Sequence, residues 1–176
     1  MHSPNDNIFE IRDPVHTSIP FDVHERQVLD HPFVQRLRRI RQLGVAQYSF
    51  PGATHSRFSH SVGVMHLAGI AFDVIFRDRP FSTVKKYRQF RYCVRMAALL
   101  HDVGHGPYSH AVEFAMPKLN TLPGFEQADP NIQAMHEEYT IAILTQTSLA
   151  NVIASQFDFT ADHVAALVDS SRVIED

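Results

Sequence analysis

Apolar side chains recur at helical spacing along most of the chain, and only its beginning has the pattern of strands. Residues 8–16 and 18–21 mix β-branched and aromatic residues around prolines, which indicates two short strands or an extended arm. Everywhere else the spacing is that of helices joined by loops. The pattern therefore predicts an all-α fold with at most a short N-terminal β-hairpin or arm.

The expected helices differ in how apolar they are and in how they end. Residues 84–101 become apolar on every side towards the end of the segment, which predicts a central, buried helix. Pro32 and Gly44 are expected at the two ends of an earlier helix, and Pro80 is expected to end the next one. The remaining predicted helices cover residues 57–77, 109–115, 135–146, 149–156 and 161–168.

Composition and charge narrow the class of protein. The 176 residues are 44% hydrophobic and 20% charged, which suits one compact domain with a buried core. A net charge of −3 argues against nucleic acid as a partner. No apolar run reaches the roughly 20 residues of a membrane helix, and the single cysteine, Cys93, suits a reducing compartment. We therefore expect a cytoplasmic protein that binds neither membranes nor nucleic acid.

The 12 histidines of the chain are numerous beside its 16 lysines and arginines, and some of them lie in polar clusters. His101 and Asp102 end an otherwise apolar helix, where burial is costly unless a partner such as a divalent metal offsets it. Arg57 and His60 are three residues apart and share a helix face, an arrangement that suits a metal beside a phosphate. His136 begins another helix. Each residue alone has an ordinary structural explanation, and only the combination indicates a metal site.

Four ordered segments resemble the HD-domain metal-dependent phosphohydrolases, in the branch of the dNTP triphosphohydrolases. They cover residues 12–16, 35–44, 50–64 and 101–110, and His136-Glu137 follows them. The resemblance implies an all-α HD fold, with residues 1–176 as a single HD domain. This domain would comprise the N-terminal and central parts of the family's catalytic core, without its C-terminal part.

The resemblance also assigns roles to particular residues. It implies a metal held by His60, His101 and Asp102, catalytic roles for His105, His110, Glu113 and His136, substrate contacts from Arg57, Gln42 and Leu43, and an allosteric nucleotide site lined by Asp30, Gln35 and Arg38. Members of the family cleave a dNTP to deoxynucleoside and inorganic triphosphate. A homo-oligomer and a guanine-nucleotide activator are further implied partners.

The implied metal is a divalent transition ion such as Fe, Mn, Zn or Ni, because two histidines and an aspartate suit all four. Mg²⁺ on the nucleotide phosphates is a further implied cation. We expect His110 to act as the general acid, with Glu113 orienting it and His105 assisting.

The chain departs from the family pattern at two places. The family's fourth metal ligand, an aspartate in a later Asp-x-x-Asp-Tyr-like segment, has no match, and Thr17 replaces the glycine that usually follows Asp-Pro-x-His. Two other functions stay open: an HD phosphohydrolase of another nucleotide or phosphoester, and a catalytically idle HD module that senses nucleotides.

Overall fold

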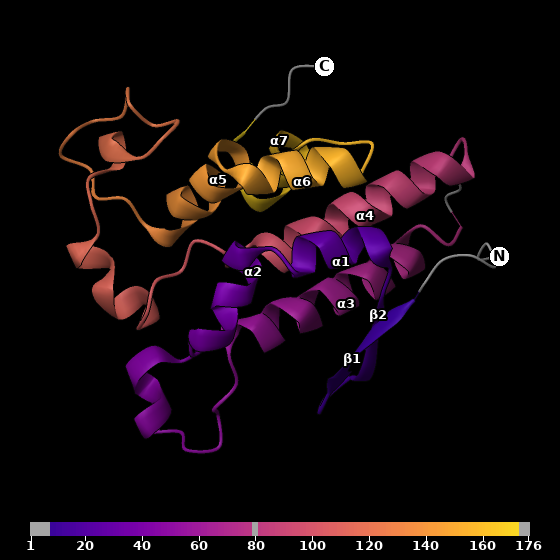
Figure 1. Ribbon diagram of the computed structural model, residues 1–176, viewed down its shortest axis with the longest axis horizontal. Helices are drawn as coiled ribbons and strands as arrows, with labels where there is room; N and C mark the ends of the chain where they lie inside the picture. Colours follow the sequence, from indigo (N-terminus) through magenta and orange to yellow (C-terminus); the bar gives the residue numbers. More distant parts are fainter. Residues whose placement is uncertain (1–7, 79–80, 173–176) are drawn as a thin grey trace.

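An antiparallel hairpin of β1 (Phe9–Asp13) and β2 (Thr17–Phe21) precedes a set of packed helices in the computed structural model, which describes residues 8–78 and 81–172 (Figure 1). Ile11 lies opposite Ile19 in the hairpin, and Ile19 is fully buried. Within the described ranges this hairpin is the only sheet. The expected all-α fold with a short N-terminal hairpin is confirmed.

Loops of varied length connect the helices, the longest of them between Ala115 and His136, and the described residues also include four segments of 3₁₀ helix. The α-helices are α1 (Val23–Leu29), α2 (Pro32–Arg36), α3 (Arg57–Ile75), α4 (Val84–Leu100), α5 (His136–Gln146), α6 (Ser148–Gln156) and α7 (Ala161–Val168). The 3₁₀ turns are η1 (Leu37–Arg39), η2 (Gly44–Tyr48), η3 (Ser109–Ala115) and η4 (Leu119–Thr121).

Helix α4 is the central helix, as its apolar end predicts. It packs against α3 on one side and against α7 on the other, while α6 packs on α1 (Figure 1). Met96, Leu99 and Leu100 of α4 are fully buried and join Met65 of α3 and Leu144 of α5 in one core. This packing fixes the end of α4, where His101 and Asp102 follow.

The helix predicted from Pro32 to Gly44 is wrong beyond its first turn. Helix α2 ends at Arg36, and after η1 the backbone of Ile40 is extended, with a φ of −106° and a ψ of 119°. The reason is that the Ile40 carbonyl accepts a hydrogen bond of 2.8 Å from the Arg57 amide. The break at Ile40 therefore joins this segment to the start of α3.

Gly44 opens η2 instead of ending a helix. Its φ of +52° is in the left-handed region, and a Cβ there would lie 2.7 Å from the Tyr108 carbonyl oxygen. The close approach holds η2 against the segment that leads into η3.

Helix α3 begins after its N-cap, Ser56, and ends at Ile75, before Pro80, which lies outside the described residues. Among the described helices, α3 alone is long and apolar enough to cross a membrane, with a mean hydropathy of 1.3. Core helices of soluble proteins meet the same criterion. Here Phe58, Val62 and Met65 of α3 are buried in the core.

Candidate metal centre

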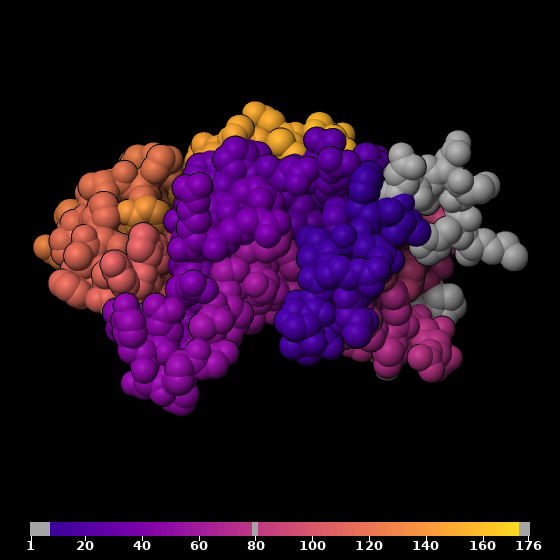
Figure 2. All heavy atoms as spheres, turned by 60° about the horizontal axis from the view of Figure 1, so that its bottom comes forward, coloured from indigo at the N-terminus to yellow at the C-terminus, as the bar shows by residue number. Residues whose placement is uncertain are grey.

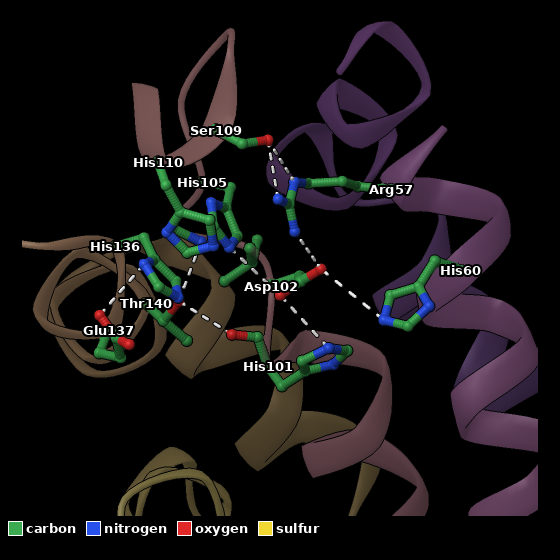
Figure 3. Close-up of polar contacts among 12 residues, drawn as sticks. Arg57, His60, His101, Asp102, His105, Ser109, His110, His136, Glu137 and Thr140 are labelled. Carbon is green, nitrogen blue, oxygen red and sulfur yellow. Dashed lines mark hydrogen bonds and ion pairs between the residues drawn. The ribbon is translucent and has the colours of Figure 1, made fainter. Parts of the chain in front are cut away.

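The predicted metal-binding and catalytic histidines come together with Arg57 and Asp102 where three helices meet (Figure 3). Arg57 and His60 lie on the first turn of α3, and the C-cap residue His101 and the next residue, Asp102, follow α4. His136 begins α5, facing this turn. The site is therefore built by the packing of α3, α4 and α5 and not by one local motif.

His60, His101 and Asp102 form a group that could hold a divalent metal. The distance is 3.9 Å from His60 Nε2 to Asp102 Oδ2 and 3.3 Å from His101 Nε2 to Asp102 Oδ1. One ligand atom from each residue lies within 4.8 Å of the others. Two imidazole nitrogens and a carboxylate oxygen are donors that divalent transition metals favour.

The protonation of this group also suits a metal. His101 Nδ1 lies 2.8 Å from the Ala98 carbonyl oxygen, which holds a proton on Nδ1 and leaves the Nε2 lone pair free. Burial lowers the pKa of His60, so its ring is neutral at neutral pH, as a ligand must be. Burial raises the pKa of Asp102, but His101 and Arg57 outweigh burial and keep that pKa below its ordinary value.

Arg57 lies beside Asp102, buried and not open to solvent. Its side chain is 4% exposed, and Nη1 donates to Asp102 Oδ2 over 2.6 Å. Nε and Nη2 both donate to Ser109 Oγ, over 3.2 and 2.7 Å. The contact of Arg57 with substrate phosphates stays a prediction, because these partners already use three of its donor groups.

A second cluster adjoins the first and contains all four predicted catalytic residues. Glu113 Oε1 lies 2.6 Å from His136 Nδ1 and 3.1 Å from His110 Nδ1. The ring of His105 stacks on that of His136 at 3.7 Å between centroids. Burial, with help from the charge of Arg57, lowers the pKa of His105 to about 3.

His105, Glu113 and His136 also bring ligand atoms within 4.8 Å of one another. The two rings are nearly parallel, at 17°, so their lone pairs run side by side and do not converge on a single point. The bond between His136 Nδ1 and Glu113 already occupies one of the nitrogens. This arrangement is better suited to holding protons than to holding a metal.

The predicted substrate residues Gln42 and Leu43 directly precede η2, which contacts η3 beside the site. Gln42 Oε1 is buried and has no hydrogen-bond partner among the described residues. The sequence alone does not reveal that this oxygen lacks a hydrogen-bond partner, because the tertiary packing around Gln42 determines it.

The three predicted allosteric residues lie near one another: Gln35 Nε2 donates over 2.7 Å to the carbonyl of Leu29, the residue before Asp30, and the role of the three residues stays a prediction. Asp30 is exposed and pairs with Arg26 at 3.1 Å. Arg38 Nε donates to Gln35 Oε1 over 2.7 Å, and its guanidinium lies 3.6 Å from the centroid of the Phe58 ring. Arg38 lines a groove of about 800 Å³ between the hairpin turn and residues 52–55, on the hollowed face shown in Figure 2.

Three supporting residues were missed by sequence reasoning. Arg36 Nη2 donates to the Val103 carbonyl over 2.7 Å, and Thr140 Oγ1 donates to the His101 carbonyl over 3.1 Å. Ser109 binds Arg57 as described above. Each acts on a residue distant in the chain, so no local pattern marks it.

Gly104 lies in a close contact between the turn after α4 and helix α5. In the structure a Cβ on Gly104 would collide with the His136 carbonyl and the Thr140 amide nitrogen. Gly104 is thus required for the packing of α5 on the turn that carries the candidate metal ligands His101 and Asp102.

The comparisons with known proteins match this region. The HD domain family matches residues 57–170. The deoxynucleoside triphosphate triphosphohydrolase SAMHD1 of Bos taurus is 38% identical over 136 residues, which are 77% of this chain and 21% of that protein. The SAMHD1 homolog of Dictyostelium discoideum is 37% identical over 72% of this chain and 24% of its own length.

The chain is also similar to a bacterial protein whose name states no function. The uncharacterized protein YwfO of Bacillus subtilis (strain 168) is 41% identical over 64% of this chain and 26% of its own length. The chain thus spans about a fifth to a quarter of the length of these relatives. The family match contains both histidine clusters. On this evidence the chain belongs to the HD domain family.

Proposed function

We propose that this chain is a metal-dependent phosphohydrolase that cleaves a dNTP to deoxynucleoside and inorganic triphosphate. The observation that carries the proposal is the convergence of His60, His101 and Asp102 beside a buried arginine. Membership of the HD domain family supports it, as do relatives named deoxynucleoside triphosphate triphosphohydrolases.

The metal would be held by His60, His101 and Asp102, and Fe, Mn, Zn or Ni suits these donors. When bound, such an ion polarises a phosphoryl oxygen and lowers the pKa of water. Arg57, whose Nη1 is held on Asp102, adds a fixed positive charge close to the same position. This charge would offset the negative charge that develops on the phosphoryl oxygens.

Proton transfer is assigned to the second cluster. Glu113 accepts from Nδ1 of His110 and of His136, which leaves Nε2 of each ring to hold or release a proton. His110 is the more accessible of the two, with a side chain 65% exposed against 13% for His136. We assign the donation of a proton to the leaving 5′-oxygen to His110, with Glu113 orienting its ring.

The remaining assignments concern the binding of the nucleotide, an activator, the oligomeric state and the location in the cell. Gln42 Oε1, which meets no hydrogen-bond donor in the described part of the chain, suits a donor group on the nucleotide, with Leu43 beside it. A guanine-nucleotide activator near Arg38, a homo-oligomer and a cytoplasmic location complete the proposal. The groove beside Arg38 supports the first of these.

The test is product analysis by ion chromatography after incubation of the purified chain with each dNTP and Mn²⁺. We expect triphosphate together with the matching deoxynucleoside. Asp102→Asn should abolish both products, because it removes a charged ligand. Asp73→Asn is the matched control: Asp73 also pairs with an arginine, Arg91, but lies outside the site, so its products should persist.

The other outcomes separate the alternatives. Orthophosphate or a nucleoside monophosphate would show a phosphohydrolase of a different specificity. Nucleotide binding with bound Mn²⁺ and no product would show an HD module without this activity. Either result contradicts the proposed reaction.

A further inference from the structure

Ser109 sits on a strained turn next to the candidate metal centre. Tyr108 and Ser109 have φ angles of +66° and +54°, two consecutive left-handed residues that are not glycine. Such conformations persist only where surrounding structure imposes them. Here the imposing contact is Gly44, which packs directly on the Tyr108 carbonyl. The outcome is that Ser109, although it follows an exposed tyrosine, is 6% exposed.

The buried Ser109 hydroxyl accepts two hydrogen bonds from Arg57. Nε and Nη2 of the guanidinium donate to the same Oγ, over 3.2 and 2.7 Å (Figure 3). A hydroxyl has two lone pairs, and both are occupied by this one side chain. Two bonds from one planar group leave the guanidinium little freedom to rotate.

The fixed guanidinium of Arg57 in turn restricts the rotation of the Asp102 carboxylate. The third donor, Nη1, holds Asp102 Oδ2 at 2.6 Å, so the other oxygen, Oδ1, is turned towards His101 and His105, at 3.3 and 3.5 Å. Rotation of the carboxylate would break a short, charge-assisted bond in a buried place. The orientation of Asp102 thus depends on the position of the Arg57 guanidinium.

We propose that Ser109 is a positioning residue of the metal centre. Its hydroxyl holds Arg57, and Arg57 fixes the Asp102 carboxylate in the orientation that a metal requires. The inference rests on the metal site of the proposed function, but not on the reaction or its substrate. Groups that orient metal ligands typically change metal affinity by 10- to 100-fold.

The test is a Mn²⁺ titration of the metal-free chain against a fluorescent chelator. Ser109→Ala removes only the hydroxyl and should weaken Mn²⁺ binding by about 10-fold. Arg57→Lys keeps the charge but loses the planar fork, and it should weaken binding by a similar factor. Because Ser109 acts through Arg57, adding Ser109→Ala to Arg57→Lys should change the affinity less than twofold.

Tyr108→Gly is the matched control for backbone strain. It relaxes the neighbouring left-handed residue and leaves the hydroxyl in place, so Mn²⁺ affinity should stay within twofold of wild type. Circular dichroism and the thermal midpoint check that each variant is folded.

Unchanged Mn²⁺ affinity in Ser109→Ala would overturn the proposal, as would equal losses from Ser109→Ala in the wild-type and Arg57→Lys backgrounds. Wild-type Mn²⁺ binding that follows the expected cycle but yields no product from a dNTP overturns the proposed reaction and supports the role of Ser109. A wild-type chain that binds no Mn²⁺ overturns both.

Discussion

Thr17 occupies the turn of the β-hairpin with a φ of +62°, in the left-handed region. The preceding residues favour this turn, because Asp13 Oδ1 accepts from the amides of Val15 and His16, both at 2.8 Å. A β-branched residue is strained in the left-handed conformation, whereas glycine adopts it freely. The glycine usual at this place in the family therefore has a conformational reason.

Thr17→Gly should raise the free energy of unfolding by about 1 kcal/mol, as measured by urea denaturation. Thr121→Gly is the matched control, since Thr121 is also exposed and also donates to a nearby carbonyl, but its φ is not positive. That control should lose stability, because it gains only chain entropy in the unfolded state. A loss of stability in Thr17→Gly would refute the strain at this turn.

The site residues divide by how visible they are in the sequence. His101 and Asp102 are visible because two ionisable residues end an apolar helix, where their burial costs free energy unless a partner offsets it. Ser109 and Thr140 are invisible because their partners, Arg57 and the His101 carbonyl, are 52 and 39 residues away. The candidate ligands carry a local signal in the sequence, and the residues that hold them in place do not.

Helix α5 is attached to the turn after α4, which carries the candidate metal ligands, by a contact that only glycine permits. Gly104 lies against the His136 carbonyl and the Thr140 amide nitrogen, and its own amide donates to Thr140 Oγ1 over 3.0 Å. These neighbours are mostly backbone in the first turns of α5, so they cannot move aside as a flexible side chain can.

Gly104→Ala should therefore lower the free energy of unfolding by about 3 kcal/mol or more. Gly52→Ala is the control, because a Cβ on Gly52 would meet nothing within 4 Å, and its stability should change by less than about 0.5 kcal/mol. Thermal and urea denaturation of the two variants provide the comparison. Near-equal stability of both would show that α5 is not anchored at Gly104.

The elements themselves were predictable to differing degrees. Helices α4 and α7 begin and end close to the predicted positions, because Thr83 and Thr160 cap them within the local sequence. The break at Ile40 was not predictable, because Phe33, Leu37 and Ile40 keep the i, i+4, i+7 spacing of a helix up to the break itself. There a bond to the distant Arg57 amide replaces the helical one.

Across the whole molecule, burial lowers the proton affinity of several histidine side chains. It lowers the pKa of His31, His60, His66 and His105, in the last case to about 3 from an ordinary 6.5. In each case the unfolded chain binds the proton more readily than the folded chain. Stability therefore falls as the pH drops below about 6.5.

Carboxylates affect a lower range of pH. The pKa of Asp73 is lowered because the bonds from Arg91 and Tyr87 outweigh the opposing effect of burial, and the pKa of Asp102 is lowered as described above. The stability they contribute is present above their ordinary pKa of 3.8 and is lost only as the pH falls through the folded value. The interval from pH 7.5 to pH 5.0 thus isolates the histidines.

We expect the metal-free chain to lose on the order of 2 kcal/mol between pH 7.5 and pH 5.0 from His105 alone, because its protonation is then largely confined to the unfolded state. Urea denaturation at the two pH values in the presence of a chelator measures the loss. His105→Gln should reduce the loss by about that amount, whatever its effect at pH 7.5. His163→Gln, on α7 away from the site, should preserve it. Equal losses in His105→Gln and wild type would mean that His105 gains its proton without unfolding, and that its burial against His136 does not hold it neutral.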